Sequence, residues 1–160
     1  MKSEKLSNIL KKNGFKDIEL DSIIESKHIL KRSGGNFRQY LFSFYDQNYT
    51  EYSLRSDLSI ASVIKFINYK NQKKTKWSYS GEAYRKQNKN DKSPVIKQTG
   101  FEIFGGNSKP KDDYEVIKTS LEIFKKSKYK NCELNLSNIE IFNVLINKLS
   151  DLPIRWREKI

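Results

Sequence analysis

The residues best suited to chemistry lie in the stretch 76–105, KWSYSGEAYRKQNKNDKSPVIKQTGFEIFG, which predicts two strands joined by a charged loop. The first predicted strand ends on Arg85, and the second carries Gln98, Gly100 and Glu102 at alternate positions. Because side chains two residues apart on a strand share a face, these three line one surface. An amide and a carboxylate beside a glycine make a poor core but a suitable floor for a small polar ligand. The pattern therefore predicts a polar pocket in which the glycine leaves room for the ligand.

A second polar pair, Asp57 and Ser59, stands where a helix is predicted to begin, within the run LRSDLS at 54–59. Carboxylate, hydroxyl and amide oxygens all accept hydrogen bonds, so these two residues are candidates for the same polar pocket. The alternative is that Asp57 only caps the helix and that Glu102 is only an exposed strand residue. The register of Gln98 and Gly100 with Glu102 favours the pocket.

Together the two segments resemble sequence motifs of the class II aminoacyl-tRNA synthetases. In motif 2 of that superfamily, a strand ending in Tyr/Phe-Arg is followed by a variable loop and a strand Q-x-G-x-E, which matches Tyr84-Arg85 and residues 98–102. Residues 54–59 are similar to the L-R-P-[ED]-x-T signature of the histidyl-tRNA synthetase group. Within that group the chain most resembles the short regulatory paralogue, the regulatory subunit of ATP phosphoribosyltransferase. Further likeness lies at KRSG (31–34) and CELNL (132–136).

The resemblance assigns roles to five residues. In the histidyl group, the positions matching Asp57, Ser59 and Gln98 hold the α-amino group of histidine. The position matching Glu102 contacts the imidazole, and the match of Arg85 serves the nucleotide and the carboxyl end of the amino acid. These five residues form the expected ligand pocket, with no catalytic residue assigned.

The resemblance also implies a fold and a function. The expected fold is α+β, an antiparallel sheet flanked by helices, like part of a class II core and forming a single domain over residues 1–160. The expected function is that of a non-catalytic subunit, which binds the catalytic subunit of a short-form ATP phosphoribosyltransferase, supports the first step of L-histidine biosynthesis and senses L-histidine. In the family the region 18–24 mediates self-association, although Leu20-Asp21 stand here where a proline is usual.

The rival interpretation is an enzyme: a fragment or relative of a histidyl-tRNA synthetase that activates histidine with ATP. In the synthetases the motif 2 loop carries a further arginine and glutamate near the second strand. The matching residues here, Ser93 to Ile96, are uncharged. No counterpart of motif 3 or of an anticodon-binding domain is found up to Ile160. These departures favour the regulatory subunit.

The net charge of +12 raises a third, weaker alternative, an RNA-binding module. However, only six of the 31 basic residues are arginine, and the lysines are spread along the whole chain. A phosphate-binding stripe would use more arginine, which makes bidentate contacts. The composition therefore indicates solubilising lysines, and nucleic acid is not an expected partner.

Other classes of site find no support in the sequence. The single histidine, His28, lies outside any cluster with metal-ligand spacing, so neither a metal nor a cofactor is expected. Cys132 is the only cysteine, which excludes an internal disulfide; its alternation with Leu134 predicts a buried strand residue. No run of 18 apolar residues occurs and the N-terminus lacks an apolar signal core, so a cytoplasmic protein without a membrane span is expected.

Periodicity and capping residues predict the remaining elements. The expected helices begin at Ser3, at Ser56 or Asp57, at Asp112 or Asp113, at Ser137 or Asn138, and after Pro153. The expected strands outside the motif 2 hairpin span residues 18–24, 37–45, 49–54 and 132–136.

Overall fold

The computed structural model describes residues 3–69, 73–87, 92–127 and 131–148. The chain falls into two compact units, Met1–Lys128 and Tyr129–Ile160. The first unit contains both sheets and all the residues of the predicted pocket. The second contains one described helix, α5 (Ile139–Lys148), most of whose apolar side chains are exposed.

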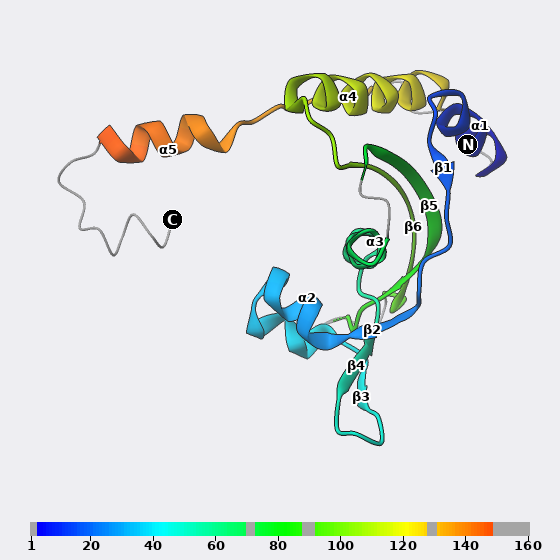
Figure 1. Cartoon of the computed structure of the whole chain (residues 1–160), viewed down its shortest axis with the longest axis vertical. Coiled ribbons are helices and arrows are strands. Elements are labelled where there is room, and N and C mark those ends of the chain that lie inside the picture. Colours follow the sequence, from blue (N-terminus) through cyan, green and yellow to red (C-terminus); the bar gives the residue numbers. More distant parts are fainter. Residues whose placement is uncertain (1–2, 70–72, 88–91, 128–130, 149–160) are drawn as a thin grey trace. The chain divides into compact units, whose positions relative to one another are not determined.

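The main sheet is built on the predicted motif 2 hairpin. Its strands are β5 (Thr75–Tyr84) and β6 (Val95–Phe104), which pair antiparallel along their whole length, with Tyr79 opposite Gly100. The short strand β1 (Lys16–Asp17) adds to the other edge of β5 in parallel, giving the order β1-β5-β6. The long hairpin is curved, and the candidate site lies on its concave side (Figure 1).

A smaller antiparallel sheet and two short helices follow the first strand of the chain. The sheet has the order β2-β4-β3, and the polar turn Asp46–Tyr49 joins β3 to β4. These elements enclose a separate core of Ile24, Ile29 and Leu41. Their bounds are β2 Ile23–Glu25, α2 Ser26–Ser33, the 3₁₀ helix η1 Gly35–Tyr40, β3 Ser43–Tyr45 and β4 Glu51–Leu54.

Helix α3 (Leu58–Ile67) lies on the concave side of the main sheet (Figure 1). Its first residue, Leu58, is buried in a cluster with Tyr79 and Ala83 of β5. Asp57 has extended backbone dihedrals and accepts a hydrogen bond from the N–H of Ile60, which is N-cap geometry. The predicted helix start is therefore confirmed, and the cap fixes where the helix meets the sheet.

Helices α1 (Ser3–Lys12) and α4 (Lys109–Lys126) contact each other. The side-chain amide of Asn13, just after α1, donates to Glu122 of α4 at 2.9 Å. Gly14 then takes φ = +80°, the left-handed conformation that suits a helix stop. The turn delivers Phe15 edge-on to Phe101 of β6, with ring centroids 5.0 Å apart.

The fold class is confirmed: helices flank a sheet whose main hairpin is antiparallel. Several details differ from the expectations. Helix α2 was not predicted, because its apolar residues are adjacent instead of three or four apart. The predicted first strand of the 37–45 hairpin is shorter, since residues up to Tyr40 form η1. The strand predicted at 132–136 is wrong: in the structure these residues form neither strand nor helix, and Cys132 is exposed.

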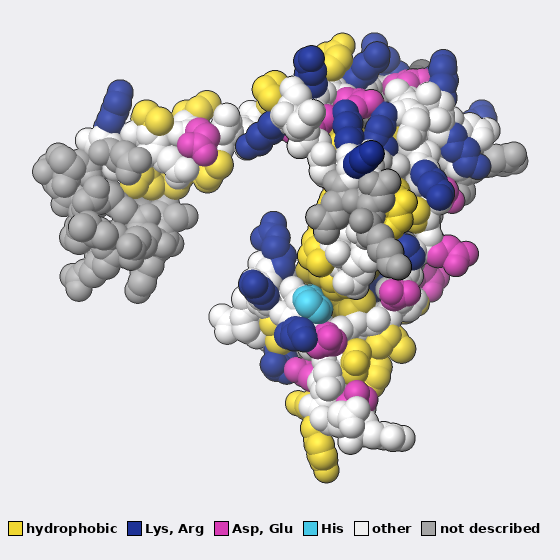
Figure 2. Space-filling view, viewed as in Figure 1, with side chains coloured by type: hydrophobic (Ala, Val, Ile, Leu, Met, Phe, Trp, Pro, Cys, Tyr) yellow, Lys and Arg dark blue, Asp and Glu magenta, His cyan; other side chains and the backbone are white. Residues whose placement is uncertain are grey.

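The helix predicted after Pro153 lies outside the described residues. Among those that are described, no helix is long and apolar enough to cross a membrane, and no group of three metal-ligating side chains occurs. On the face of the first unit seen in Figure 2, Lys and Arg side chains are interspersed with acidic and neutral ones and form no continuous stripe.

Arg55 connects three segments of the first unit. Its side chain is only 7% exposed, and its Nε donates to the carbonyl of Glu82 at 2.8 Å. Its Nη1 donates to the carbonyls of Leu20 and Asp21. The backbone carbonyl of Arg55 also accepts from the N–H of Tyr84 at 2.9 Å. A buried guanidinium is tolerated because these acceptors replace water.

We predict that Arg55→Met lowers the free energy of unfolding by about 3 kcal/mol or more, because it leaves several buried carbonyls without a donor. Arg38→Met is the matched control: Arg38 is exposed and, among the described residues, its guanidinium pairs with Glu51 alone, so its loss should change stability far less. Urea denaturation of both variants measures the difference. Equal effects of the two substitutions would contradict the structural role of Arg55.

Candidate functional site

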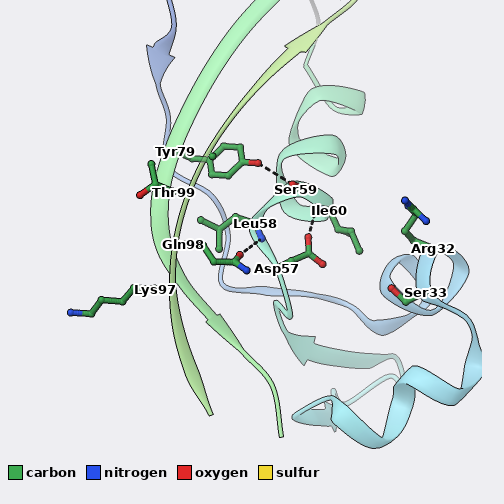
Figure 3. A pocket seen from close by; sticks show the side chains of 11 residues that line it. Arg32, Ser33, Asp57, Leu58, Ser59, Ile60, Tyr79, Lys97, Gln98 and Thr99 are labelled. Carbon is green, nitrogen blue, oxygen red and sulfur yellow. Dashed lines mark hydrogen bonds between the residues drawn. The ribbon is translucent and has the colours of Figure 1, made fainter. Parts of the chain in front are cut away.

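A cavity of about 730 Å³ opens where three elements meet. The start of α3 forms one wall, β6 forms the second and the end of α2 forms the third (Figure 3). The lining residues include Asp57, Ser59 and Gln98, three of the five predicted site residues. The structure thus brings together side chains from two segments about 40 residues apart in the sequence.

Asp57 and Gln98 organise the wall of the cavity at the start of α3. One carboxylate oxygen of Asp57, Oδ1, accepts from the N–H of Ile60 at 2.9 Å. The carbonyl oxygen of Gln98 accepts from the N–H of Leu58 at 3.2 Å (Figure 3). Within the part of the chain that the structure describes, Oδ2 of Asp57 has no protein partner. A carboxylate can accept several hydrogen bonds, so Asp57 can cap the helix and still bind a cation.

Glu102 is joined to the cavity wall through two hydroxyl groups. Its Oε1 accepts from Oγ of Ser59 at 3.0 Å and from the phenol of Tyr79 at 2.8 Å. The Ser59 and Tyr79 hydroxyls also lie within hydrogen-bond distance of each other, at 3.1 Å. Both donors use the same carboxylate oxygen, so among the described residues Oε2 of Glu102 has no protein partner. The geometry leaves that oxygen able to accept from a ligand N–H.

Tyr79 is a site residue that the sequence analysis missed. It is 3% exposed, and burial raises the pKa of its phenol to about 12. The phenol therefore stays protonated at neutral pH and remains a donor to Glu102. The alternation along β5 could have identified it. Tyr79 lies two residues before Gly81, which pairs with Gln98, so Tyr79 faces the same side of the sheet as Gln98.

The two glycines of this surface make room for protein side chains. A Cβ added to Gly100 would lie 2.6 Å from Cε2 of Tyr79, because the tyrosine ring covers the glycine. A Cβ added to Gly81 would lie 2.7 Å from a guanidinium nitrogen of Arg55. At Gly100, which also lines the cavity, the Tyr79 ring occupies the space next to the glycine. Its absent side chain instead admits the ring that orients Glu102.

The structure places Arg85 at a second cavity, of about 420 Å³, and not at the first. Its Nε donates to the carbonyl of Ser56 at 2.7 Å, which ties the end of β5 to the segment before α3. Two further cations, Lys86 and Lys92, line this second cavity with the aromatic Tyr40. Lys86 and Lys92 were not predicted as site residues, because both belong to the charged loop after Arg85 and the sequence does not show that they line one cavity.

Comparison with known proteins extends these observations. A family model for histidyl-tRNA synthetase matches residues 2–153 of the chain. The chain belongs to the histidyl-tRNA synthetase family. A histidine–tRNA ligase of Methanococcus vannielii is 28% identical to it over 150 residues, which are 92% of this chain and 35% of that protein. The family explains why the two sequence motifs occur in this order.

Solved structures of similar fold agree with the family. Apo histidyl-tRNA synthetase of Staphylococcus aureus matches with a TM-score of 0.62 at 18% identity, over 79% of this chain and 30% of that one. A protein described as an ATP phosphoribosyltransferase regulatory subunit/histidyl-tRNA synthetase, from Bacillus halodurans, matches with a TM-score of 0.58 at 23% identity, over 76% and 32%. The chain thus spans about a third of the length of these relatives, and its fold corresponds to part of a class II synthetase core.

We predict that Gly100→Ala lowers the free energy of unfolding by about 1–3 kcal/mol, because the added methyl group displaces the Tyr79 ring. Gly35→Ala is the control, since an added Cβ there meets nothing within 4 Å; its effect should stay within about 0.5 kcal/mol. Thermal or urea denaturation measures both. A neutral Gly100→Ala variant would show that the ring does not depend on the glycine.

Proposed function

We propose that this member of the histidyl-tRNA synthetase family is a non-catalytic regulatory subunit that binds L-histidine. The observation that carries the proposal is the cavity itself. Asp57, Ser59 and Gln98 line it, and Glu102 is bonded to its wall, all on the side of the sheet that α3 covers. An ammonium group fits the free carboxylate oxygen of Asp57, and an imidazole N–H fits that of Glu102.

The charge of one segment supports a regulatory role over catalysis. The segment Ser93 to Ile96, which leads into β6, carries no charge, whereas synthetases have an arginine and a glutamate there. The Bacillus halodurans protein of similar fold is named in part as an ATP phosphoribosyltransferase regulatory subunit. On this proposal the partner is the catalytic subunit of a short-form ATP phosphoribosyltransferase, and histidine is the effector.

A second candidate function is activation of histidine with ATP. The observation in its favour is the second cavity, where Arg85, Lys86 and Lys92 meet Tyr40 and Phe37. Three cations beside two aromatic rings are suited to an anion that carries a flat ring, and ATP is such an anion. The regulatory function requires only that histidine binds in the first cavity, whereas this candidate also requires that the bound histidine reacts with ATP.

Calorimetric titration tests the histidine site. We predict that Glu102→Gln weakens L-histidine binding by about ten- to a hundredfold, the equivalent of losing a charge-assisted hydrogen bond of roughly 1.5–3 kcal/mol. Glu82→Gln is the matched control, because Glu82 lies in β5 of the same hairpin but on the opposite face of the sheet from Glu102. If the wild type gives no heat at millimolar histidine, or if Glu102→Gln binds equally well, the pocket assignment fails.

Two assays separate the regulatory subunit from the enzyme. We predict no histidine-dependent exchange of pyrophosphate with ATP by this chain, and co-sedimentation with a short-form ATP phosphoribosyltransferase catalytic subunit at micromolar concentration. Exchange that is abolished by Arg85→Ala would overturn the regulatory role in favour of histidine activation. Two independently sedimenting species would argue against the proposed partner.

A further inference from the structure

The cavity at the start of α3 has acceptors for the ammonium and imidazole groups of an amino acid. The two expected binding groups for its carboxylate, the N-terminus of α3 and Arg85, are not available there. A helix N-terminus often binds anions through free N–H groups. At the start of α3 two of these groups are already used, since Leu58 N–H donates to Gln98 and Ile60 N–H donates to Asp57. The carboxylate of Asp57 also repels an anion at this end of the helix. The helix terminus alone is therefore a poor carboxylate site.

Arg85, the arginine expected near the carboxyl end, is not among the residues that line this cavity. It lines the neighbouring one, and its Nε is committed to the carbonyl of Ser56. Lys97 belongs to the lining of the first cavity, but its side chain extends away from the space beneath α3 (Figure 3). Neither cation is placed to face Asp57 across the cavity.

Arg32 is placed there. It lies in the last turn of α2 and lines the cavity on the side opposite β6, next to Ser33 (Figure 3). Within the described residues its guanidinium forms no ion pair and no hydrogen bond. The helix that carries it is anchored, because Ile29 is fully buried in the core of the smaller sheet. A cation on a fixed helix thus faces the anionic wall at Asp57 with its donors unused.

We propose that Arg32 binds the carboxylate of the amino acid in this cavity. The ligand then spans the cavity, with its ammonium group at Asp57 and its carboxylate at the planar guanidinium, which can donate two parallel hydrogen bonds. This assignment rests on the proposed amino-acid site. It adds that the ammonium and the carboxylate of the amino acid are bound by two different helices, α3 and α2, which are separated in the sequence by η1, β3 and β4.

The test compares L-histidine with histamine, which keeps the ammonium and the imidazole and lacks the carboxylate. Calorimetry is carried out on the full chain and on Arg32→Ala. Lys31→Ala is the control, since Lys31 is an exposed cation on the same helix outside the cavity lining. We expect Arg32→Ala to weaken L-histidine binding by about tenfold. This is the lower end of the range for a charge-assisted hydrogen bond, because Arg32 is exposed to solvent. Histamine binding should change less than about twofold, and Lys31→Ala should affect neither ligand.

The outcomes separate this inference from the function on which it rests. If the wild type binds neither compound, the amino-acid site itself is refuted. The role of Arg32 is overturned, and the amino-acid site stands, in two cases. Either Arg32→Ala binds histidine as tightly as the wild type does, or its affinities for histidine and for histamine fall by the same factor. Partial recovery of histidine affinity in Arg32→Lys, with histamine still unaffected, would confirm that the charge acts on the carboxylate.

Discussion

The buried guanidinium of Arg55 is the interaction on which the arrangement of the first unit depends. It binds carbonyl groups of the segment before β2 and of β5, while its own backbone is bonded to Ser22 and Tyr84. Asp57 and the start of α3 follow only two residues later. The position of the site over the sheet is thus set by one cation that would be unstable if any of these segments moved away. Gly81 is part of the same constraint, because any larger residue would displace the guanidinium.

The site inherits a second constraint from the pairing of Tyr79 with Gly100. The ring fits only over a residue without a side chain, and in that position its phenol reaches Glu102. Burial raises the pKa of Tyr79 to about 12, so the phenol remains a donor at neutral pH. The packing of the sheet and the orientation of the carboxylate therefore cannot be separated, and a residue that serves the core also prepares the pocket.

Asp57 and Gln98 illustrate how one group meets structural and ligand-binding demands. Each binds a backbone N–H at the start of α3, which is the role of a helix cap. Their remaining hydrogen-bonding capacity is directed to the cavity. The two interpretations of Asp57 that the sequence allowed, a cap and a ligand residue, are compatible because a carboxylate has two oxygens. The cap is observed, and it holds the second oxygen in place.

The sequence by itself determined what depends on neighbours within a few residues. The alternation of Gln98, Gly100 and Glu102, the cap at Asp57 and the glycine stop at Gly14 follow from local backbone periodicity and dihedral preference. Only the tertiary structure decided which segments meet: it placed Arg85 at a different cavity and Tyr79 over Gly100. It also put the unpredicted helix α2, with Arg32, on the far wall of the pocket. A strand such as the one expected at 132–136 likewise requires a hydrogen-bonding partner, which local sequence does not supply. Such contacts join residues tens of positions apart through side-chain packing, and no short-range pattern encodes them.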